Sequence, residues 1–461
     1  MEHPEFRCVR VDLQGLSRPA QIQPLFEEIW FPDAEDQIAL HHGQRYVARL
    51  MRCRLARSPM RSALDANSSY LITGGLGSLG LKLGRWMVEQ GVRYLILVGR
   101  HGPSRSAQAA VADLERAGAQ VLVREADISI QGEVCRLFRK IGSSMPPLRG
   151  LIHAAGILDD GVLRQQTWER FETVMAPKAS GAWNLHLETK VLGLDFFIMF
   201  SSVAALLGSP GQGNYCAANA FMDALAQYRR SHGLPALSIN WGPWSENGMA
   251  GGLSARDQIR FSSQGLGQID SIQGLRLMAE LMKHPLAQIG VLPVDWSKYF
   301  AQSADLASLP FLEFLAEGFR SPGTASAQIY EQIKNAPVRS RRAVLETAVR
   351  TQLATVLGVH SLDHLAPRQR LFDLGLDSLM AVDLKNRLQS GLGCTVSASL
   401  VFDYPTLESL LQHLSEEVIN LEFSCVAESS AKKEIIAGGD LSEMSDDDIA
   451  DLLARKLETI D

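Results

Sequence analysis

The first feature that could do chemistry is a run of glycines that follows a short apolar strand. Tyr70–Thr73 leads directly into Gly74-Gly75-Leu76-Gly77-Ser78-Leu79-Gly80 and then into a helical pattern. Such glycines let the backbone turn sharply and approach a pyrophosphate, whose charge is stabilised at the N-terminus of the following helix. A lone glycine motif is a weak signal, but here a strand, a helix and a second strand at the right distance accompany it. The sequence therefore predicts a dinucleotide site.

The end of the second strand predicts which dinucleotide is bound. Enzymes that use NAD usually place an acidic residue here, whereas this chain has Gly99-Arg100, with Arg100 twenty residues past Gly80. A guanidinium suits a 2′-phosphate, so NADPH is favoured. Asp127 could hold the adenine amino group, and Ala154-Ala155-Gly156 could let the backbone approach the cofactor. The expected cofactor-binding residues are Thr73, Gly74, Gly75, Gly77, Ser78, Leu79, Gly80, Gly99, Arg100, Asp127, Ile128, Ala154, Ala155 and Gly156.

A second set of residues could reduce a carbonyl group. Ser202 closes the fifth strand, and Tyr215 follows thirteen residues later. This spacing resembles the short-chain dehydrogenase/reductase family, which implies that Ser202 hydrogen-bonds the carbonyl, Tyr215 donates a proton and a lysine lowers the pKa of Tyr215. The chemistry needs these residue types, because a ketone that accepts hydride develops an alkoxide and needs a donor aimed at its oxygen. A free tyrosine with a pKa near 10 is a poor acid at pH 7 unless a cation lowers that value.

The lysine is not at its usual place. The ordinary family has lysine four residues after the tyrosine, where this chain has Asn219. Lys178 lies instead within Met175–Gly181, on the helix where the ordinary family carries asparagine. This exchange of lysine and asparagine between the two helices resembles the one in ketoreductase domains of modular type I polyketide synthases. The resemblance implies that Lys178 keeps a cation beside Tyr215, while Asn219 holds the surrounding hydrogen bonds.

The same resemblance extends over most of the chain. The segments that carry it are His153–Gly156, Phe200–Ser202, Gly211–Tyr215, Asn240–Trp244, Glu35–Leu50 and Pro293–Trp296. Leu158-Asp159-Asp160 resembles the mark of B-type ketoreductases, which yield the D-configured hydroxyl; read structurally, the pair before Gly161 is only a turn. Leu207 stands where A-type domains have tryptophan. Ala217, two residues past the tyrosine, is not proline, so no α-epimerisation is signalled.

Ser378 is the candidate for a covalent attachment. Leu374–Leu379 resembles the site that carries a phosphopantetheine arm in acyl carrier proteins, and so does Val401–Thr406 downstream. Asp377 and Ser378 would occupy the exposed start of a helix, where a phosphodiester gains from unpaired amides. A separate transferase would attach the arm from coenzyme A. The alternative is a serine that only caps a bundle helix.

Short apolar strands alternating with helices must position these residues. The expected strands are Tyr70–Thr73, Tyr94–Val98, Gln120–Arg124, Gly150–His153, Asp195–Ser201, Ala236–Trp241 and Gln288–Val291. Their spacing fits the right-handed crossovers of a doubly wound parallel sheet. Helices are expected at Ala343–Leu357, Asp377–Leu388 and Pro405–Leu414. The predicted fold is an α/β Rossmann-like sheet followed by a small all-α four-helix carrier bundle.

These patterns divide the chain into six segments. The first 55 residues read as strands, with a hairpin turning near Gly43. Residues 1–57 resemble a remnant of a ketoreductase structural subdomain, so the chain looks like a fragment or a late-starting reading frame. The catalytic domain is expected at 58–320, a linker at 321–340, the carrier at 341–420, a second linker at 421–440 and a docking-like helix at 441–461. That helix has one apolar stripe and should dock on the carrier or on a partner polypeptide.

Composition excludes several functions. The 461 residues are 46% hydrophobic and carry a net charge of -6 without a long basic run, which argues against nucleic acid as a partner. No apolar stretch approaches the roughly 20 residues that span a membrane. Six scattered cysteines show no metal-ligand or disulfide spacing, and no secretory signal begins the chain, so a cytoplasmic protein without a metal is expected.

The sequence therefore predicts a polyketide synthase segment that reduces a carrier-bound β-ketoacyl thioester with NADPH and carries the chain on a phosphopantetheine arm. The expected partners are upstream ketosynthase and acyltransferase parts, a phosphopantetheinyl transferase, and a downstream synthase subunit or thioesterase reached through the C-terminal helix. The alternative is a carrier or binding fragment whose ketoreductase is catalytically silent. A reductive-release enzyme of peptide synthetases is a further rival, but its carrier precedes its reductase and its glycine loop differs.

Overall fold

Seven parallel strands form the central sheet of the computed structural model. The strands are β4 (Ser69–Thr73), β5 (Tyr94–Gly99), β6 (Gln120–Glu125), β7 (Leu148–His153), β8 (Phe196–Ser202), β9 (Leu237–Trp241) and β10 (Gln288–Val291). They lie in the order β10-β9-β8-β7-β4-β5-β6, and each neighbouring pair is parallel. The predicted doubly wound sheet is therefore confirmed.

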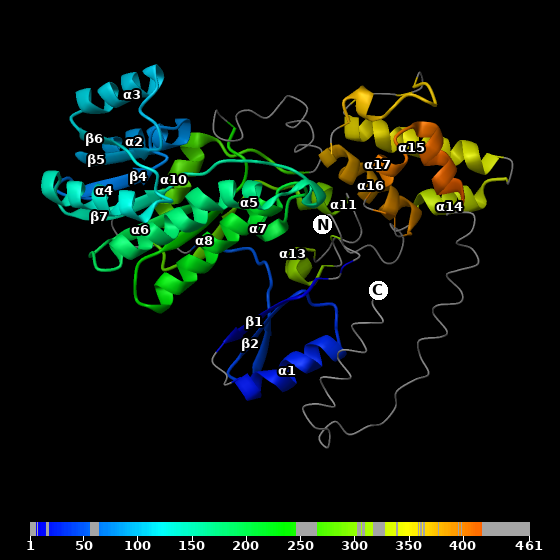
Figure 1. Cartoon of the computed structure of the whole chain (residues 1–461), viewed down its shortest axis with the longest axis horizontal. Helices are drawn as coiled ribbons and strands as arrows, with labels where there is room; N and C mark the ends of the chain where they lie inside the picture. The colour runs from blue at the N-terminus through cyan, green and yellow to red at the C-terminus, as the bar shows by residue number, and fades with distance from the viewer. Residues whose placement is uncertain are drawn as a thin grey trace. The chain divides into compact units, whose positions relative to one another are not determined.

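Two layers of helices cover the faces of this sheet (Figure 1). One layer contains α2 (Ser78–Glu89), α3 (Arg105–Arg116) and α10 (Ser271–Leu281), and the other contains α4 (Gln131–Ser144), α6 (Gly181–Thr189) and α8 (Gly213–Ser231). Side chains of a strand alternate between faces, so Tyr70 and Ile72 pack in the first layer and Leu71 in the second. A sheet buried on both faces explains why its strands read as continuous apolar runs.

The strand order reverses between β4 and β7. From β4 the chain moves outward to β5 and β6, and then returns to β7 on the other side. Loops that leave the carboxyl ends of β4 and β7 therefore diverge, which opens a crevice where such sheets bind ligands. The backbone N–H of Ala154 donates to the carbonyl of Thr73 at 3.1 Å and joins the two strand ends beneath the crevice.

Shorter elements complete this part of the chain. They are η2 (Leu163–Gln165), α5 (Trp168–Met175), η3 (Ala176–Ser180), α7 (Ala204–Leu207), α11 (Trp296–Ala301), η4 (Pro310–Leu312) and α13 (Glu313–Ala316). The η3 segment is a π-helix between α5 and α6. It matters for the site because it contains Lys178.

The N-terminal region differs from its prediction in one element. Strand β1 (Arg10–Gln14) pairs in parallel with β2 (Gln37–His41), which forms the predicted hairpin with β3 (Gln44–Val47) around Gly43, where φ is +76°. Between β1 and β2, however, α1 (Arg18–Trp30) is a helix, so reading this region as strands alone was wrong. Phe26 and Trp30 are four residues apart and stack with ring centroids at 5.3 Å, as neighbours on one helix face do.

The C-terminal region is helical. It contains α14 (Gln328–Asn335), α15 (Arg341–Leu357), η6 (Phe372–Leu374), α16 (Ser378–Leu392) and α17 (Leu400–Asp403), and residues 407–416 are also helical. Helix α14 lies within the stretch 321–340 that was expected to be a linker, which corrects that expectation. Ile329 and Ile333 of α14 are buried. A Cβ placed on Gly391 of α16 would lie 2.9 Å from Ile329 Cγ1, so α14 packs on the bundle.

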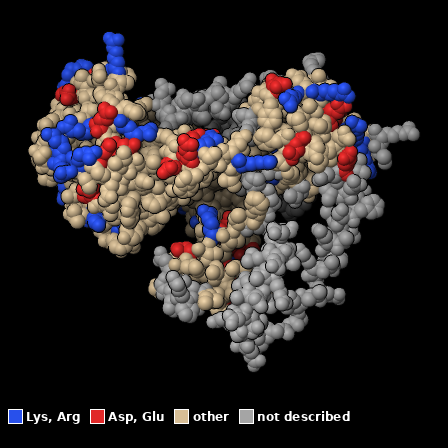
Figure 2. Space-filling model, in the orientation of Figure 1, with Lys and Arg blue, Asp and Glu red and all other residues tan. Residues whose placement is uncertain are grey.

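The structure describes residues 6, 8–14, 18–55, 64–245, 265–301, 306, 309–316, 328–337, 340–357, 359, 362, 365–376, 378–394, 396–397 and 399–416. The expected second linker (421–440) and the docking-like helix (441–461) lie outside these residues. Within them, no helix is long and apolar enough to cross a membrane. Figure 2 shows acidic and basic side chains beside one another on the visible face, in keeping with pairs such as Arg149–Asp195.

Candidate active site

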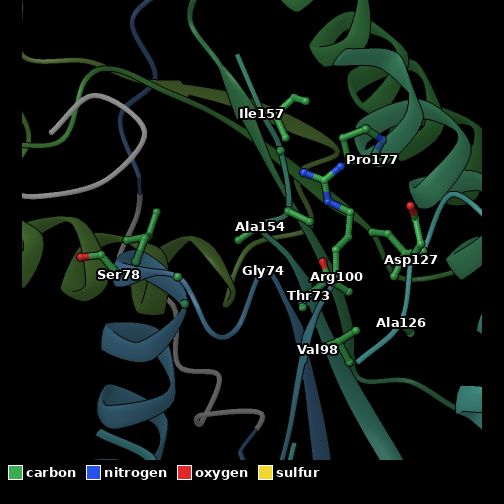
Figure 3. A pocket seen from close by; sticks show the side chains of 17 residues that line it. Thr73, Gly74, Ser78, Val98, Arg100, Ala126, Asp127, Ala154, Ile157 and Pro177 are labelled. Atoms are coloured by element: carbon green, nitrogen blue, oxygen red, sulfur yellow. The ribbon is translucent and has the colours of Figure 1, made fainter. Parts of the chain in front are cut away.

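A cavity of about 420 Å³ occupies the crevice at the strand reversal. Figure 3 shows Ser78 on one side of it, Arg100 and Asp127 on the other, and Gly74 and Ala154 between them. All the expected cofactor-binding residues line this cavity except Gly75, together with Val98, Ala126, Ile157 and Pro177. Residues from four strand ends and the start of α2 therefore meet around one space.

The glycine loop is shaped by close backbone contacts. Gly74 has φ +67°, and a Cβ there would lie 2.9 Å from the backbone nitrogen of Ala155. A Cβ on Gly80 would lie 2.6 Å from the Cα of Gly75. Gly75 itself faces β4 and β5, since its Cβ would lie 2.7 Å from the carbonyl oxygen of Ile72, so it serves packing rather than the cavity wall. The loop thus fits a pyrophosphate, because bare backbone and the start of a helix face the cavity.

Two glycines of the same helix should respond differently to alanine. Gly80→Ala would drive a methyl group into the backbone of Gly75, so we expect affinity for a dinucleotide in this cavity to fall about tenfold or more, the loss of roughly 1.4 kcal/mol of binding. Gly84→Ala is the matched control, because its Cβ would meet Leu114 Cδ1 at an ordinary 3.5 Å. Titration of NADPH fluorescence measures both variants. Equal affinities would contradict the assignment of the loop.

Asp127 is held in place by its own turn. Its Oδ1 accepts from the backbone N–H of Ser129 at 2.9 Å and from the Ser129 hydroxyl at 2.7 Å, and its backbone N–H donates to Glu133 Oε2 at 2.7 Å. Asn184 of α6 donates to the carbonyl of Ile128 at 2.9 Å. The wall opposite the glycine loop is therefore preorganised.

Lys178 is buried in the π-helical segment. Pro177 lacks an N–H, so it interrupts the hydrogen-bond ladder of an ordinary helix, and the wider π turn accommodates this change. The side chain of Lys178 is 2% exposed, and its Nζ donates to the carbonyl of Phe200 at 3.0 Å. The same Nζ lies 5.3 Å from the centroid of the Tyr215 ring. The expected cation therefore stands beside the phenol, although it comes from another helix.

Burial controls the charge of both groups. It lowers the pKa of Lys178 to about 7, while the charge of Asp223 acts in the opposite direction. The pKa of Tyr215 is raised, chiefly by burial, and hydrogen bonding with Ser202 and Asn219 opposes this rise. The lowered tyrosine pKa expected from the lysine is therefore not what the structure has. A raised pKa keeps the phenol protonated at neutral pH, which is the form that can give a proton to a carbonyl oxygen.

Ser202 and Asn219 flank the phenol. Ser202 ends β8, and its hydroxyl accepts from the backbone N–H of Ala204 at 3.2 Å. Asn219 donates to the carbonyl of Tyr215 at 2.7 Å, one helical turn earlier. Its Oδ1 is buried without a hydrogen-bond partner among the described residues. The structure brings all four expected catalytic residues to one place.

A buried polar network that the sequence reasoning missed lies behind these residues. Asp223 of α8 accepts from the Ser238 hydroxyl at 2.5 Å and from Asn240 Nδ2 at 2.8 Å. Asn240 also donates to the Ser201 hydroxyl at 3.0 Å. Tyr215, Asn219 and Asp223 follow one another at intervals of four residues, so they share one face of α8. That periodicity was a signal that could have found Asp223.

His153 belongs to a segment that the sequence analysis named, but it was given no role there. Its Nδ1 lies 2.7 Å from the Thr73 hydroxyl, and the side chain is fully buried between β4 and β7. Burial, together with the charge of Lys178, lowers its pKa to about 3. His153 is therefore neutral at neutral pH and adds no charge beside Lys178.

Ser378 is the first residue of α16, which corresponds to the helix expected at Asp377–Leu388 and extends to Leu392. The side chain of Ser378 and the whole of Asp377 lie outside the described residues. Gly375 precedes the helix with φ +89°, a turn that glycine makes readily. Leu384 and Leu388 are fully buried in the bundle, so α16 is held by its apolar face.

The fold and the site define a nucleotide-dependent reductase joined to a helical carrier. Residues 68–246 match the family model described as KR domain, and residues 347–414 match the model described as phosphopantetheine attachment site. Polyketide synthase GfsB of Streptomyces halstedii is 40% identical over 373 residues, which cover 77% of this chain and 7% of that protein. Mycoketide-CoA synthase of Mycobacterium tuberculosis is 38% identical over 366 residues, which cover 77% of this chain and 9% of that protein. The chain belongs to the type I polyketide synthases, as a ketoreductase and acyl carrier region.

Solved structures agree with this membership. A structure described as the first ketoreductase of the tylosin synthase is 31% identical with a TM-score of 0.58, and the match covers 67% of this chain and 66% of that one. An A-type ketoreductase of a modular synthase is 29% identical with a TM-score of 0.61, and the match covers 69% and 67%. The chain spans 7% of the length of the Streptomyces halstedii relative and 9% of the length of the Mycobacterium tuberculosis relative.

Proposed function

We propose that the chain reduces a β-ketoacyl thioester, held on a phosphopantetheine arm at Ser378, to the β-hydroxyacyl thioester. The observation that carries the proposal is the meeting of Lys178, Ser202, Tyr215 and Asn219 beside a cavity shaped for a dinucleotide. The competing function, a carrier with a silent ketoreductase, does not explain why these four residues lie together.

The chain's own residues would divide the work. When bound, NADPH supplies the hydride that the carbonyl carbon accepts. Ser202 orients the carbonyl oxygen, and Tyr215 gives it a proton as negative charge develops there. The ammonium of Lys178, over the Tyr215 ring, stabilises the phenolate that this transfer creates.

The preference for NADPH over NADH rests on Arg100. Its side chain lines the cavity beside Asp127 at the end of β5, where a guanidinium can bind a 2′-phosphate by two parallel hydrogen bonds (Figure 3). The proposal that the product has the D-configured hydroxyl of the B type is based on the loop Leu158-Asp159-Asp160. Partners in the same assembly line would be upstream ketosynthase and acyltransferase parts, a phosphopantetheinyl transferase, and a downstream subunit or thioesterase.

Turnover of a diketide thioester mimic tests the reductase. We expect NADPH to be oxidised in step with formation of the β-hydroxy product, and NADH to support a much lower kcat/KM. Absence of NADPH oxidation by the folded chain would favour the silent-reductase alternative.

Loading of the arm tests the carrier separately. Incubation with coenzyme A and a promiscuous phosphopantetheinyl transferase should add the mass of one arm to the chain, and Ser378→Ala should remove this gain completely. Ser397→Ala, in the same bundle, is the matched control and should load normally. Loading of Ser378→Ala would place the attachment elsewhere.

A further inference from the structure

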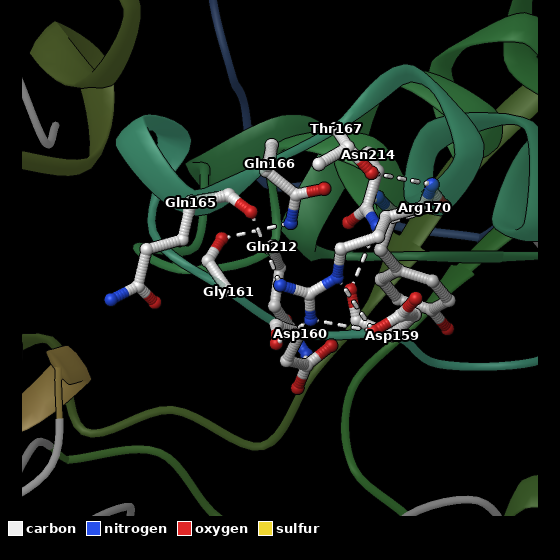
Figure 4. A network of polar contacts seen from close by, with 10 residues as sticks. Asp159, Asp160, Gly161, Gln165, Gln166, Thr167, Arg170, Gln212 and Asn214 are labelled. Carbon is white, nitrogen blue, oxygen red and sulfur yellow. Dashed lines mark hydrogen bonds and ion pairs between the residues drawn. The ribbon is translucent and has the colours of Figure 1, made fainter.

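Arg170 of α5 is bonded to the loop expected to set the stereochemistry. Its Nε and Nη2 donate to Asp159 Oδ1 at 2.9 Å and 2.5 Å, and Nη2 also donates to the backbone carbonyl of Asp160 at 2.6 Å (Figure 4). One guanidinium thus binds a side chain and a backbone group of adjacent residues. Charge-assisted bonds of this kind are stronger than neutral ones and fix geometry as well.

The opposite side of the loop is bonded to the start of α8. Asp160 Oδ2 accepts from Gln212 Nε2 at 2.9 Å, and Asn214 Nδ2 donates to the carbonyl of Asp159 at 2.8 Å (Figure 4). Asn214 is fully buried, and its Oδ1 accepts from the backbone N–H of Tyr215 at 2.8 Å. The loop is therefore connected through one side chain to the residue that donates the proton.

The absence of a side chain at Gly161 leaves room for the guanidinium of Arg170. A Cβ on Gly161 would lie 2.6 Å from Arg170 Nη1, so the arginine packs directly against bare backbone. Ile157, just before the loop, lines the cofactor cavity, and the next residue, Leu158, is 39% exposed. Both carboxylates are thus turned to protein partners, while Leu158 remains the apolar group available to a substrate.

The charges of Asp159 and Arg170 support an ion pair between the loop and α5. The guanidinium of Arg170 holds the pKa of Asp159 below its usual range, whereas burial raises the pKa of Asp160. Asp159 is therefore a stable anion opposite Arg170 at neutral pH. The side chain of Arg170 is only 29% exposed, so solvent screens this pair less than a fully exposed one.

We infer that Arg170 is a specificity-determining positioning residue, which holds Leu158–Asp160 against the start of α8 so that the β-ketone presents one face to the hydride. This inference rests on the proposed function. A loop released from Arg170 could move Leu158 and open the second approach, so the two product enantiomers would form at more similar rates. Turnover itself would change less, because Arg170 contacts none of the four catalytic side chains.

The test compares Arg170→Gln with Arg164→Gln, which removes the same charge from an exposed residue of the neighbouring η2 segment. Each variant reduces a diketide thioester mimic without an α-substituent, with NADPH as the reductant. Chiral chromatography then measures the enantiomer ratio of the β-hydroxy product. We expect the ratio to fall about tenfold in Arg170→Gln, which corresponds to about 1.4 kcal/mol between the two barriers, and to stay unchanged in Arg164→Gln. Arg170→Lys should restore part of the ratio, because it keeps the charge.

Each outcome decides the inference. An active Arg170→Gln enzyme with an unchanged ratio overturns it, since a merely structural residue would lower the yield or melting temperature and leave the ratio alone. Should that variant fail to fold, Asp159→Asn, which keeps the shape of the side chain, provides the same comparison. An inactive wild-type chain contradicts the proposed function instead. Hydrogen exchange of residues 157–162 then still decides whether Arg170 holds the loop, because release would speed exchange in Arg170→Gln alone.

Discussion

Replacing Tyr215 by phenylalanine should reduce turnover of a β-ketothioester by about 10²- to 10⁴-fold, the usual contribution of a positioned general acid. The substitution removes only the hydroxyl from the ring that lies below Lys178, and it leaves the glycine loop and cavity intact. NADPH affinity should therefore stay unchanged. Steady-state kinetics and a fluorescence titration of NADPH measure the two effects separately.

Tyr228→Phe is the matched control for this prediction. Tyr228 lies on the same helix, α8, but it is 44% exposed and packs near Trp183 and His232. We expect this variant to keep full activity. A Tyr215→Phe enzyme that turns over at the wild-type rate would show that another group donates the proton.

The ionisation of Lys178 should appear in the pH dependence of kcat/KM. Its pKa of about 7 means that the ammonium is present below that pH and is lost as the pH rises through it. The positive charge stabilises the developing phenolate of Tyr215, so the rate should fall as the pH rises through about 7. Lys178→Met should lower the rate at low pH by about 10²-fold, the scale for one electrostatic stabiliser, and remove this falling limb.

Asp223 provides a test of the same ionisation with a definite sign. Its charge raises the pKa of Lys178, so Asp223→Asn should lower that pKa and move the falling limb to lower pH. The other titratable groups near Lys178 should not move the falling limb. His153 is neutral above a pKa of about 3, and the raised pKa of Tyr215 keeps its phenol neutral. A limb that stays in place, or moves upward, would contradict the role of Asp223.

Two exposed residues control for these substitutions. Lys190→Met removes a lysine just after α6, and Asp195→Asn removes an acid at the start of β8 that pairs with Arg149. Both leave the environment of Lys178 unchanged. We therefore expect wild-type pH profiles from them, measured over the same range and with thermal melting as a check on folding.

The sequence predicted the strands of the sheet and which residues lie together at the candidate site, because both follow from local patterns, whereas the roles of these residues stay a prediction. Apolar runs with turns between them located all seven strands of the central sheet, and the thirteen-residue interval between Ser202 and Tyr215 placed them together. The glycine loop could be predicted because only bare backbone fits beside Ala155 and Gly75.

Other features depend on contacts between distant residues, so no local pattern predicted them. The bond between Lys178 and the carbonyl of Phe200 joins residues 22 apart, and the burial that lowers the lysine pKa comes from the whole helical layer. The rise in the Tyr215 pKa has the same origin. Helix α1 contains Pro24, a residue that ordinarily interrupts a helix, so its local sequence pattern argued against a helix here.

The most direct test of the whole account loads a β-ketoacyl group onto the arm of Ser378 and adds NADPH to the intact chain. Mass spectrometry of the carrier-bound product should show the gain of one hydride and one proton, and the β-ketoacyl-loaded Tyr215→Phe chain should keep its original mass over the same time. A loaded, folded wild-type chain whose mass does not change with NADPH would contradict the claim that this reductase acts on cargo held by its own polypeptide.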